Sequence, residues 1–233
     1  MIDLLKKKNN INLVFYNYHK MEFILDIPSK LNLKGDDYLL MKFNVSEEEF
    51  WEISNEDSNF ELINGVLIIH SPASTEHEEL FGYLNFVLRY YTEQTQKGKV
   101  FGSRLVMRLS EKWNPEPDLM VILPEHYDRI KETRIQGPAD LVIEILSPTT
   151  RELDLTKKLP YFRKAGIGEI WIIDPKSQEL TIYWEHEEKK WGKENADSYI
   201  ESHILPDFKF KPIWMWERDK YPSSQMIEDI FHK

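Results

Sequence analysis

The segment LVIEILS, residues 141–147, constrains the fold most, because its composition is typical of a strand that is covered on both faces. Apolar residues flank one acidic residue, Glu144, on both sides. Near-continuous apolar strands of this kind belong to sheets with helices on both faces. A helix is expected after Pro148 and as far as Ala165, and the apolar segment EIWIIDP, residues 169–175, predicts another strand. The order strand, helix, strand predicts an α/β or α+β fold with helices on the faces of a sheet.

Local signals predict the elements that precede this core. Ser46 followed three residues later by Glu49 is a capping-box pattern, which predicts a short helix. In FELINGVLIIHSP, the pair Asn64-Gly65 predicts the turn of a β-hairpin. Residues 75–97 are expected to form a long helix, because apolar residues recur on one face with helical spacing. That face consists of Leu80, Leu84, Val87, Leu88 and Tyr91.

Between this long helix and the core segment, two stretches have the pattern of strands. VFGSRLVMRLS, residues 100–110, alternates apolar and polar residues and predicts one strand. PDLMVIL, residues 117–123, predicts a short apolar strand that begins at Asp118. The chain therefore divides into an N-terminal extension over 1–42, a main domain over 43–217 and a C-terminal tail over 218–233.

Composition narrows the classes of protein to which the chain can belong. With 40 acidic and 30 basic residues the net charge is −10, which argues against a protein that binds nucleic acid mainly through lysine and arginine. A bound metal ion can reverse such a field locally, so a phosphate-processing enzyme stays open. The sequence has no cysteine, which excludes disulfides and thiolate metal sites. It shows no apolar run of membrane-spanning length and no secretory signal, so we expect a cytoplasmic protein without a membrane partner.

Glu144 raises the question of why an apolar strand carries an ionisable group. A buried carboxylate needs an ionic partner, a metal ion or a shift toward its neutral form. One interpretation is a salt bridge to Arg104 or Arg108. The other is a site shared with Asp118, 26 residues earlier at the start of the preceding predicted strand. Carboxylates at one edge of a sheet suit Mg²⁺ or Mn²⁺, and such an ion can polarise a phosphoryl oxygen. Taken alone, Asp118 after a proline is also common turn chemistry.

Glu61, His77 and Lys158 are further candidates, and each has a plainer interpretation. Glu61 is either an acid of the site or a solvated charge at a strand end. His77, in the first turn of the long predicted helix, is either catalytic or a surface and capping residue. Lys158 either reaches the site or pairs with Asp154, which is four residues earlier on the predicted helix. Pro160 implies that this helix kinks there or begins there.

Several spaced blocks of the sequence resemble the Uma-two family of predicted restriction endonucleases, which belongs to the PD-(D/E)XK nuclease superfamily. The resemblance extends from about residue 45 to residue 216, and FELINGVLIIHSPASTEH is similar to the family's early segment. The blocks that carry it are Pro117-Asp118, Ile143-Glu144-Ile145-Leu146-Ser147-Pro148, Asp154, Lys158, Phe162, Ala165-Gly166-Ile167, Glu169-Ile170-Trp171 and Asp174-Pro175.

The resemblance implies a restriction-endonuclease-like fold, with a mixed central sheet flanked by helices. It implies that Asp118 and Glu144 are metal ligands and that Glu61 is an auxiliary acid. The lysine of the superfamily stands two residues after the second acid, where this chain has Leu146. Lys158, from the next helix, is the expected substitute.

These observations lead to a Mg²⁺- or Mn²⁺-dependent endonuclease acting on DNA as the first hypothesis. A module that keeps the nuclease fold without catalysis is the second, and a metal-dependent hydrolase of another substrate is the third, because fold and motif do not fix a substrate. A homodimer is compatible with a nuclease that cuts duplex DNA, although no motif specifies one.

Overall fold

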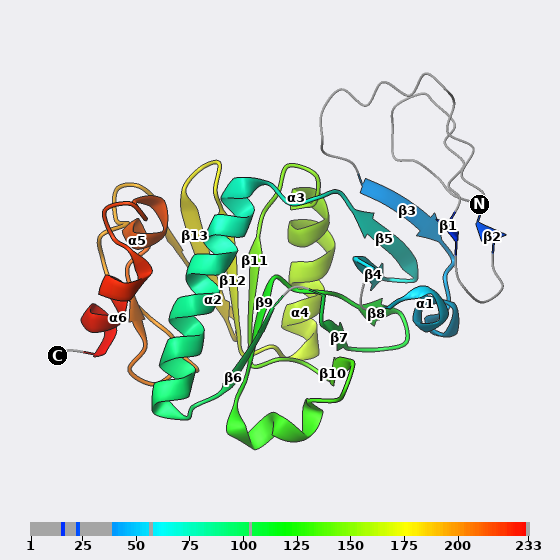
Figure 1. The fold of residues 1–233 in the computed structure, drawn as a ribbon, viewed down its shortest axis with the longest axis horizontal. Helices are drawn as coiled ribbons and strands as arrows, with labels where there is room; N and C mark the ends of the chain where they lie inside the picture. Colours follow the sequence, from blue (N-terminus) through cyan, green and yellow to red (C-terminus); the bar gives the residue numbers. More distant parts are fainter. Residues whose placement is uncertain (1–14, 17–21, 24–38, 56–57, 103, 232–233) are drawn as a thin grey trace. The chain divides into compact units, whose positions relative to one another are not determined.

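A computed structural model describes residues 15–16, 22–23, 39–55, 58–102 and 104–231 (Figure 1). The chain forms two compact units. Unit 1 consists of Met1–Pro72 with Ser110–Asn114, and unit 2 consists of Ala73–Leu109 with Pro115–Lys233. The domain boundaries expected from the sequence stay predictions, and most of the expected N-terminal extension lies outside the described residues.

Unit 1 contains a four-stranded sheet and a short helix. The hairpin predicted around Asn64-Gly65 is confirmed, because both residues have positive φ, 53° and 76°, as a tight type I′ hairpin turn requires. The predicted helix cap is confirmed as well, since the Ser46 hydroxyl accepts a hydrogen bond from the Glu49 amide at 3.1 Å. The sheet has the order β3-β5-β4-β8. The elements are β1 (Phe15–Tyr16), β2 (Glu22–Phe23), β3 (Leu39–Phe43), α1 (Glu47–Ile53), β4 (Phe60–Ile63), β5 (Val66–His70) and β8 (Trp113–Asn114).

Unit 2 is built on a six-stranded mixed sheet with the order β14-β13-β12-β11-β9-β6. Its central strands β11 and β12 are parallel, and the flanking pairs are antiparallel. A parallel pair needs a crossover connection, which the helical segment between β11 and β12 provides. The strands are β6 (Lys99–Gly102), β9 (Leu119–Ile122), β11 (Leu141–Ile145), β12 (Glu169–Asp174), β13 (Glu179–Trp184) and β14 (Glu187–Trp191).

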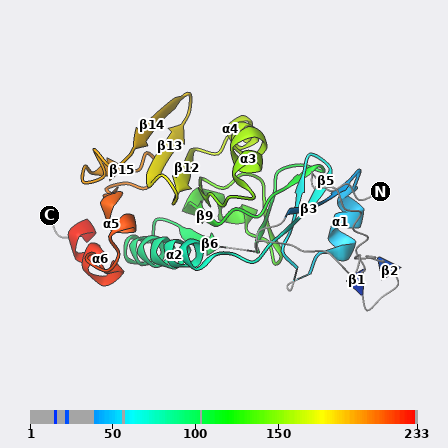
Figure 2. The ribbon, with the colours of Figure 1, turned by 90° about the horizontal axis from the view of Figure 1, so that it is seen from above.

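Helices cover both faces of this sheet, as the sequence predicted. The long helix α2 (Thr75–Thr95) lies on one face, and the crossover segment with α4 (Leu159–Ala165) lies on the other (Figure 2). Alternate residues of β11 point to the two faces. Leu141, Ile143 and Ile145 join the core beneath α2, whereas Val142 joins the core beneath α4. Glu144 follows the alternation of Val142, so its side chain belongs to the face that the crossover segment covers.

The prediction of one strand over residues 100–110 is wrong. The segment splits into β6 and β7 (Val106–Arg108), which belong to different sheets, because Arg104 adopts a left-handed conformation with φ of 75°. The strand β7 pairs in parallel with β10 (Arg134–Gln136), which follows the 3₁₀ helix η1 (Pro124–Arg129). A period-two pattern does not register such a break, because the side chains continue to alternate on both sides of it.

The C-terminal part of unit 2 packs against α2. Met226 of α6 (Ser223–Phe231) is fully buried in the core beneath α2, and the Tyr83 hydroxyl of α2 donates to the carbonyl of Tyr221 at 3.3 Å. The remaining elements are β15 (Ile200–Glu201), β16 (Lys209–Phe210) and α5 (Ile213–Trp216). The expected fold class, an α+β arrangement with a mixed central sheet and flanking helices, is confirmed. None of the helices in the described part of the chain has the length and apolar character that crossing a membrane requires.

Candidate active site

Asp118 and Glu144 come together through the pairing of β9 with β11. In this antiparallel pair Val142 lies opposite Met120, and Ile143 lies opposite Leu119. One further step along the same register sets Glu144 opposite Asp118. A hydrogen bond fixes this end of the pair, because the backbone N–H of Ile145 donates to Oδ2 of Asp118 at 2.7 Å. Strand register therefore places the two acids on neighbouring strands, and their expected role as metal ligands stays a prediction.

Glu144 lies in an ion pair with Lys158. Its side chain is 5% exposed, that of Lys158 is 3% exposed, and the Lys158 Nζ lies 2.6 Å from Oε1 of Glu144. The sequence left open whether an arginine or a metal accounts for this buried acid. The structure adds a lysine from the crossover segment, ten positions beyond the loop at Pro148, as an ionic partner. Lys158 therefore lies beside Glu144, and its expected catalytic role stays a prediction.

A π-helical turn brings Lys158 to this position. The crossover segment runs from α3 (Arg151–Leu153) through the π-helical turn η2 (Asp154–Lys158) into α4. The N–H of Leu159 donates to the carbonyl of Asp154, five residues earlier. Pro160 then stands in the first turn of α4, where its missing N–H costs least. The sequence offered a kink at Pro160 or a helix start near it, and the structure shows the start, since α4 begins at Leu159 directly after the π turn.

Asp154 is a second buried acid beside Lys158. It is 4% exposed, and its Oδ1 lies 3.5 Å from the Lys158 Nζ. The spacing of four residues between Asp154 and Lys158 was the available signal, and it predicted an ordinary pair within one helix. Burial of both side chains changes that interpretation, because the lysine now serves two buried carboxylates from different elements.

His77 contacts the other member of the acidic pair. Its Nε2 lies 3.3 Å from Oδ1 of Asp118, and its side chain is 15% exposed. The backbone of His77 is held as well, because its N–H donates to the hydroxyl of Ser74, the N-cap of α2. His77 therefore lies beside Asp118 with most of its side chain covered, and its expected catalytic role stays a prediction.

The electrostatic environment favours the protonated form of His77. Burial alone lowers the pKa of this imidazole, but the hydrogen bond and the charge of Asp118 raise it, and Glu78 adds to the increase. The net effect is a pKa above the ordinary value of 6.5. With Oδ2 bound to Ile145 and Oδ1 facing His77, the carboxylate of Asp118 is held in one orientation.

Glu61 belongs to unit 1. It lies within β4, is 1% exposed, and its Oε2 is 3.1 Å from Nε2 of His70 on the neighbouring strand β5. The interpretation of Glu61 as a solvated strand-end charge is therefore wrong. Its expected role as an auxiliary acid stays a prediction.

The residues of unit 2 fit a divalent cation of the magnesium type. Mg²⁺ is commonly held by one or two carboxylates, with water and phosphate oxygens as its remaining ligands. Asp118 and Glu144 offer two carboxylates from adjacent strands, and the Asp118 side chain is 20% exposed. Across the described ranges no group of three or more His, Cys, Asp or Glu residues could hold a metal by itself. The pair therefore suits an ion that water and a phosphate complete, and not one enclosed by protein ligands.

Comparisons with known proteins bear on the family and the fold of this chain. The model of the family "Uma2: Putative restriction endonuclease" matches residues 47–211. A solved structure titled as a "putative nuclease belonging to DUF820", from Anabaena variabilis ATCC 29413, superposes with a TM-score of 0.64 at 19% sequence identity. That match covers 74% of this chain and 97% of the other, and at this identity it shows a shared fold. A search of curated proteins gave no match.

The family model covers α1 to β16, including both strands of the acidic pair and the crossover segment with Lys158. The range agrees with the resemblance noted between residues 45 and 216. The chain belongs to the Uma2 family.

Proposed function

We propose that this protein is a metal-dependent endonuclease that hydrolyses phosphodiester bonds of DNA. The observation that carries the proposal is the pairing of Asp118 with Glu144 across β9 and β11, with the Lys158 ammonium 2.6 Å from Glu144. The resemblance to the nuclease superfamily implies two acids and a lysine at the site, and metal-assisted phosphoryl transfer can use carboxylates to hold the ion. The family description and the fold shared with a protein titled as a nuclease support the same reaction class.

Asp118 and Glu144 would hold the ion. When bound, Mg²⁺ or Mn²⁺ supplies the Lewis acid that polarises a phosphoryl oxygen and favours the ionised form of a water molecule. The net charge of −10 is compatible with this role, because a bound cation would offset the repulsion between an acidic protein and a phosphodiester.

The residues of the chain supply positioning and charge. Lys158 brings a buried ammonium to the acidic pair, and its N–H groups donate to a phosphate oxygen or to the attacking water. The carboxylate of Asp154 holds this ammonium from the side of η2. His77 and the Ile145 amide keep the Asp118 carboxylate in one orientation, so that it needs little rearrangement to act as a ligand.

The proposal is tested by cleavage of supercoiled plasmid and single-stranded DNA with Mg²⁺ or Mn²⁺. We expect Asp118→Asn and Glu144→Gln each to lower the cleavage rate on the order of a thousandfold, because each removes a charged ligand while keeping the side-chain shape. Matched controls are Asp128→Asn and Glu125→Gln, two exposed acids of η1 in the same unit. Equal rates in the wild type and in both site variants would exclude the proposed site.

One observation favours a non-catalytic role for the same fold. The close pair between Lys158 and Glu144 already neutralises the second acid, and a buried ion pair can serve structure alone. Titration with Mn²⁺, followed by its paramagnetic effect on water relaxation, separates the two functions. Binding that disappears in Asp118→Asn supports the nuclease, whereas a wild type that binds no Mn²⁺ at the pair supports the binding module.

A further inference from the structure

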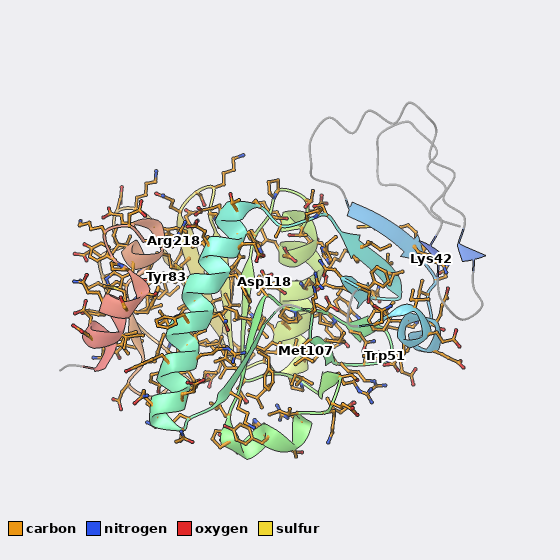
Figure 3. The ribbon with its side chains drawn as sticks, in the orientation of Figure 1. Lys42, Trp51, Tyr83, Met107, Asp118 and Arg218 are labelled. Atoms are coloured by element: carbon orange, nitrogen blue, oxygen red, sulfur yellow. The ribbon has the colours of Figure 1, made fainter. Side chains whose placement is uncertain are left out.

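The outward face of α2 carries large aromatic side chains and a glycine. Phe86 is 44% exposed and Tyr90 is 36% exposed, and their ring centroids lie 6.4 Å apart. Gly82 stands one turn before Phe86, so these residues share one face at helical spacing. The opposite side of the helix is fully used, because Leu80, Leu84 and Leu88 lie in the core of unit 2. Tyr83 and Arg218, labelled in Figure 3, mark the flank of α2 that packs against the C-terminal segment.

No contact within the described part of the chain explains why position 82 is a glycine. A Cβ atom built on Gly82 meets no described atom within 4 Å. At Gly102 of the same unit, by contrast, a Cβ would approach the ring of Phe81 to 2.7 Å, so packing there requires glycine. A glycine inside a helix costs roughly 0.5–1 kcal/mol relative to alanine. Gly82 therefore carries a cost that its surroundings in unit 2 do not explain, and close approach of another backbone would explain it.

We propose that this face of α2 packs antiparallel against the same face of a second copy of the chain. A two-fold axis passes the helix pair at the level of Leu84. It therefore places a residue that lies a given number of positions before Leu84 in one copy opposite the residue the same number of positions after Leu84 in the other copy. Phe86 of one copy then lies over Gly82 of the other, and the contact occurs twice, as in a self-complementary dimer interface. The missing Cβ at Gly82 provides the space that the ring needs.

The charges of the face complement one another in the same register. Glu79 and Arg89 are both exposed and stand five residues on either side of Leu84, so each Glu79 lies opposite an Arg89 of the other copy. Within the chain, Glu79 lies 3.7 Å from Arg218 and Arg89 donates to the Asn85 side chain, and both charged groups extend from an exposed surface. Antiparallel helices also set opposite ends of their dipoles side by side.

A second copy fits this face better than nucleic acid does. The acids Glu78, Glu79 and Glu93 are exposed on it, and they would repel phosphates. The proposal does not depend on the nuclease function, because it rests on α2 alone. A dimer formed through this interface would also contain two candidate active sites.

The first test is the oligomeric state by sedimentation velocity. We expect a dimer for the wild type and a monomer for Gly82→Gln, because the longer side chain fills the space beneath Phe86. At a concentration low enough that both proteins are monomers, the same variant should unfold at a temperature about 2–4 °C higher, since glutamine favours the helix. The matched control Gln94→Ala, exposed on another side of α2, should stay a dimer. A monomeric wild type, or a dimer that survives Gly82→Gln, overturns the proposal.

The second test fixes the register through disulfides, because the chain has no cysteine of its own. Glu79→Cys mixed with Arg89→Cys should form a crosslinked heterodimer on oxidation. Glu79→Cys alone should not, because two copies of this position lie about 15 Å apart along the antiparallel helices. Crosslinking of Glu79→Cys with itself, or no crosslink in the mixture, contradicts the antiparallel register.

Discussion

The parallel strands β11 and β12 each carry a buried glutamate, and the two are satisfied in different ways. Glu169 begins β12, opposite Leu141 at the start of β11, whereas Glu144 lies toward the far end of β11. Glu169 accepts hydrogen bonds from the indole N–H of Trp171 at 2.5 Å, the backbone N–H of His203 at 2.5 Å and the Ser202 hydroxyl at 3.2 Å.

The difference separates a structural acid from a candidate functional one. Glu169 meets neutral donors held by a core indole and by the backbone, so its partners cannot change without unfolding. Glu144 meets the charged tip of a long side chain, next to Asp118. A cation would share the carboxylate of Glu144, and a phosphate would share the ammonium of Lys158. Burial raises the pKa of Glu169 more than its hydrogen bonds lower it, so the net pKa of this carboxyl lies above its ordinary value.

The strongest way to break the comparison is to remove the charged partner of Glu144. Lys158→Met keeps the length and apolar stem of the side chain but leaves Glu144 and Asp154 buried without this ammonium. We expect the free energy of unfolding to fall by about 3–5 kcal/mol, because a lone buried charge is costly. Urea titration of the variant and of the control Lys157→Met, an exposed neighbour in η2, measures the effect.

A double variant sharpens this result. Lys158→Met with Glu144→Gln should recover part of the lost stability, because the amide replaces a charge that has lost its partner. If Lys158→Met were as stable as Lys157→Met, the ion pair would contribute nothing and the contrast with Glu169 would fail.

A smaller loss is expected at the structural acid. Glu169→Gln turns one carboxylate oxygen into an NH₂ group, and in either orientation that group faces a donor, either Trp171 or His203. One buried donor without an acceptor costs about 1–3 kcal/mol. The cleavage rate per folded molecule should stay at the wild-type level, unlike that of Glu144→Gln. Thermal unfolding compared with Glu187→Gln, an exposed acid of the same sheet, provides the control. If Glu169→Gln unfolded at the same temperature as Glu187→Gln, the N–H groups of Trp171 and His203 would have found other acceptors.

The sequence predicted the core of the fold because its signals were local and periodic. The apolar strands, the face of α2 and the Asn64-Gly65 turn each depend on residues close in the chain. The split between β6 and β7 depends on one left-handed residue, Arg104, which carries no sequence signal comparable to a glycine. The π turn before Pro160 was equally hidden, because a proline signals a disturbed helix and not the geometry that accommodates it.

The candidate site was predictable as a set of residue types and less so as a set of contacts. Asp118 and Glu144 were identified because acids are rare in apolar strands. Their opposition follows from register between strands 26 residues apart, which no local pattern fixes. The contact of His77 with Asp118 depends on tertiary structure, because it joins a helix to the start of a strand. The burial of Asp154 beside Lys158 depends on tertiary structure as well, because other elements cover both side chains.

The mildest test compares the two ends of β12 by pH. Burial raises the pKa of Asp174, but hydrogen bonds from Ser177 and Arg151 lower it further, so its pKa lies below the ordinary 3.8. Its contribution to stability is therefore present above pH 3.8 and lost as the pH falls through the folded-state pKa. Glu169 has the opposite sign, since its raised pKa makes its contribution present below 4.5 and lost as the pH rises through the folded-state value.

We expect Asp174→Asn to lower the free energy of unfolding by less than about 1 kcal/mol at neutral pH, because Arg151 is half exposed and solvent screens the pair. Urea titrations between about pH 6 and pH 3 should show the difference from the wild type vanishing with acidification. Asp128→Asn, on an exposed acid, should show no such trend. A difference that grows toward low pH would mean that burial, and not Arg151 and Ser177, decides the charge of Asp174, and the two ends of β12 would then titrate alike.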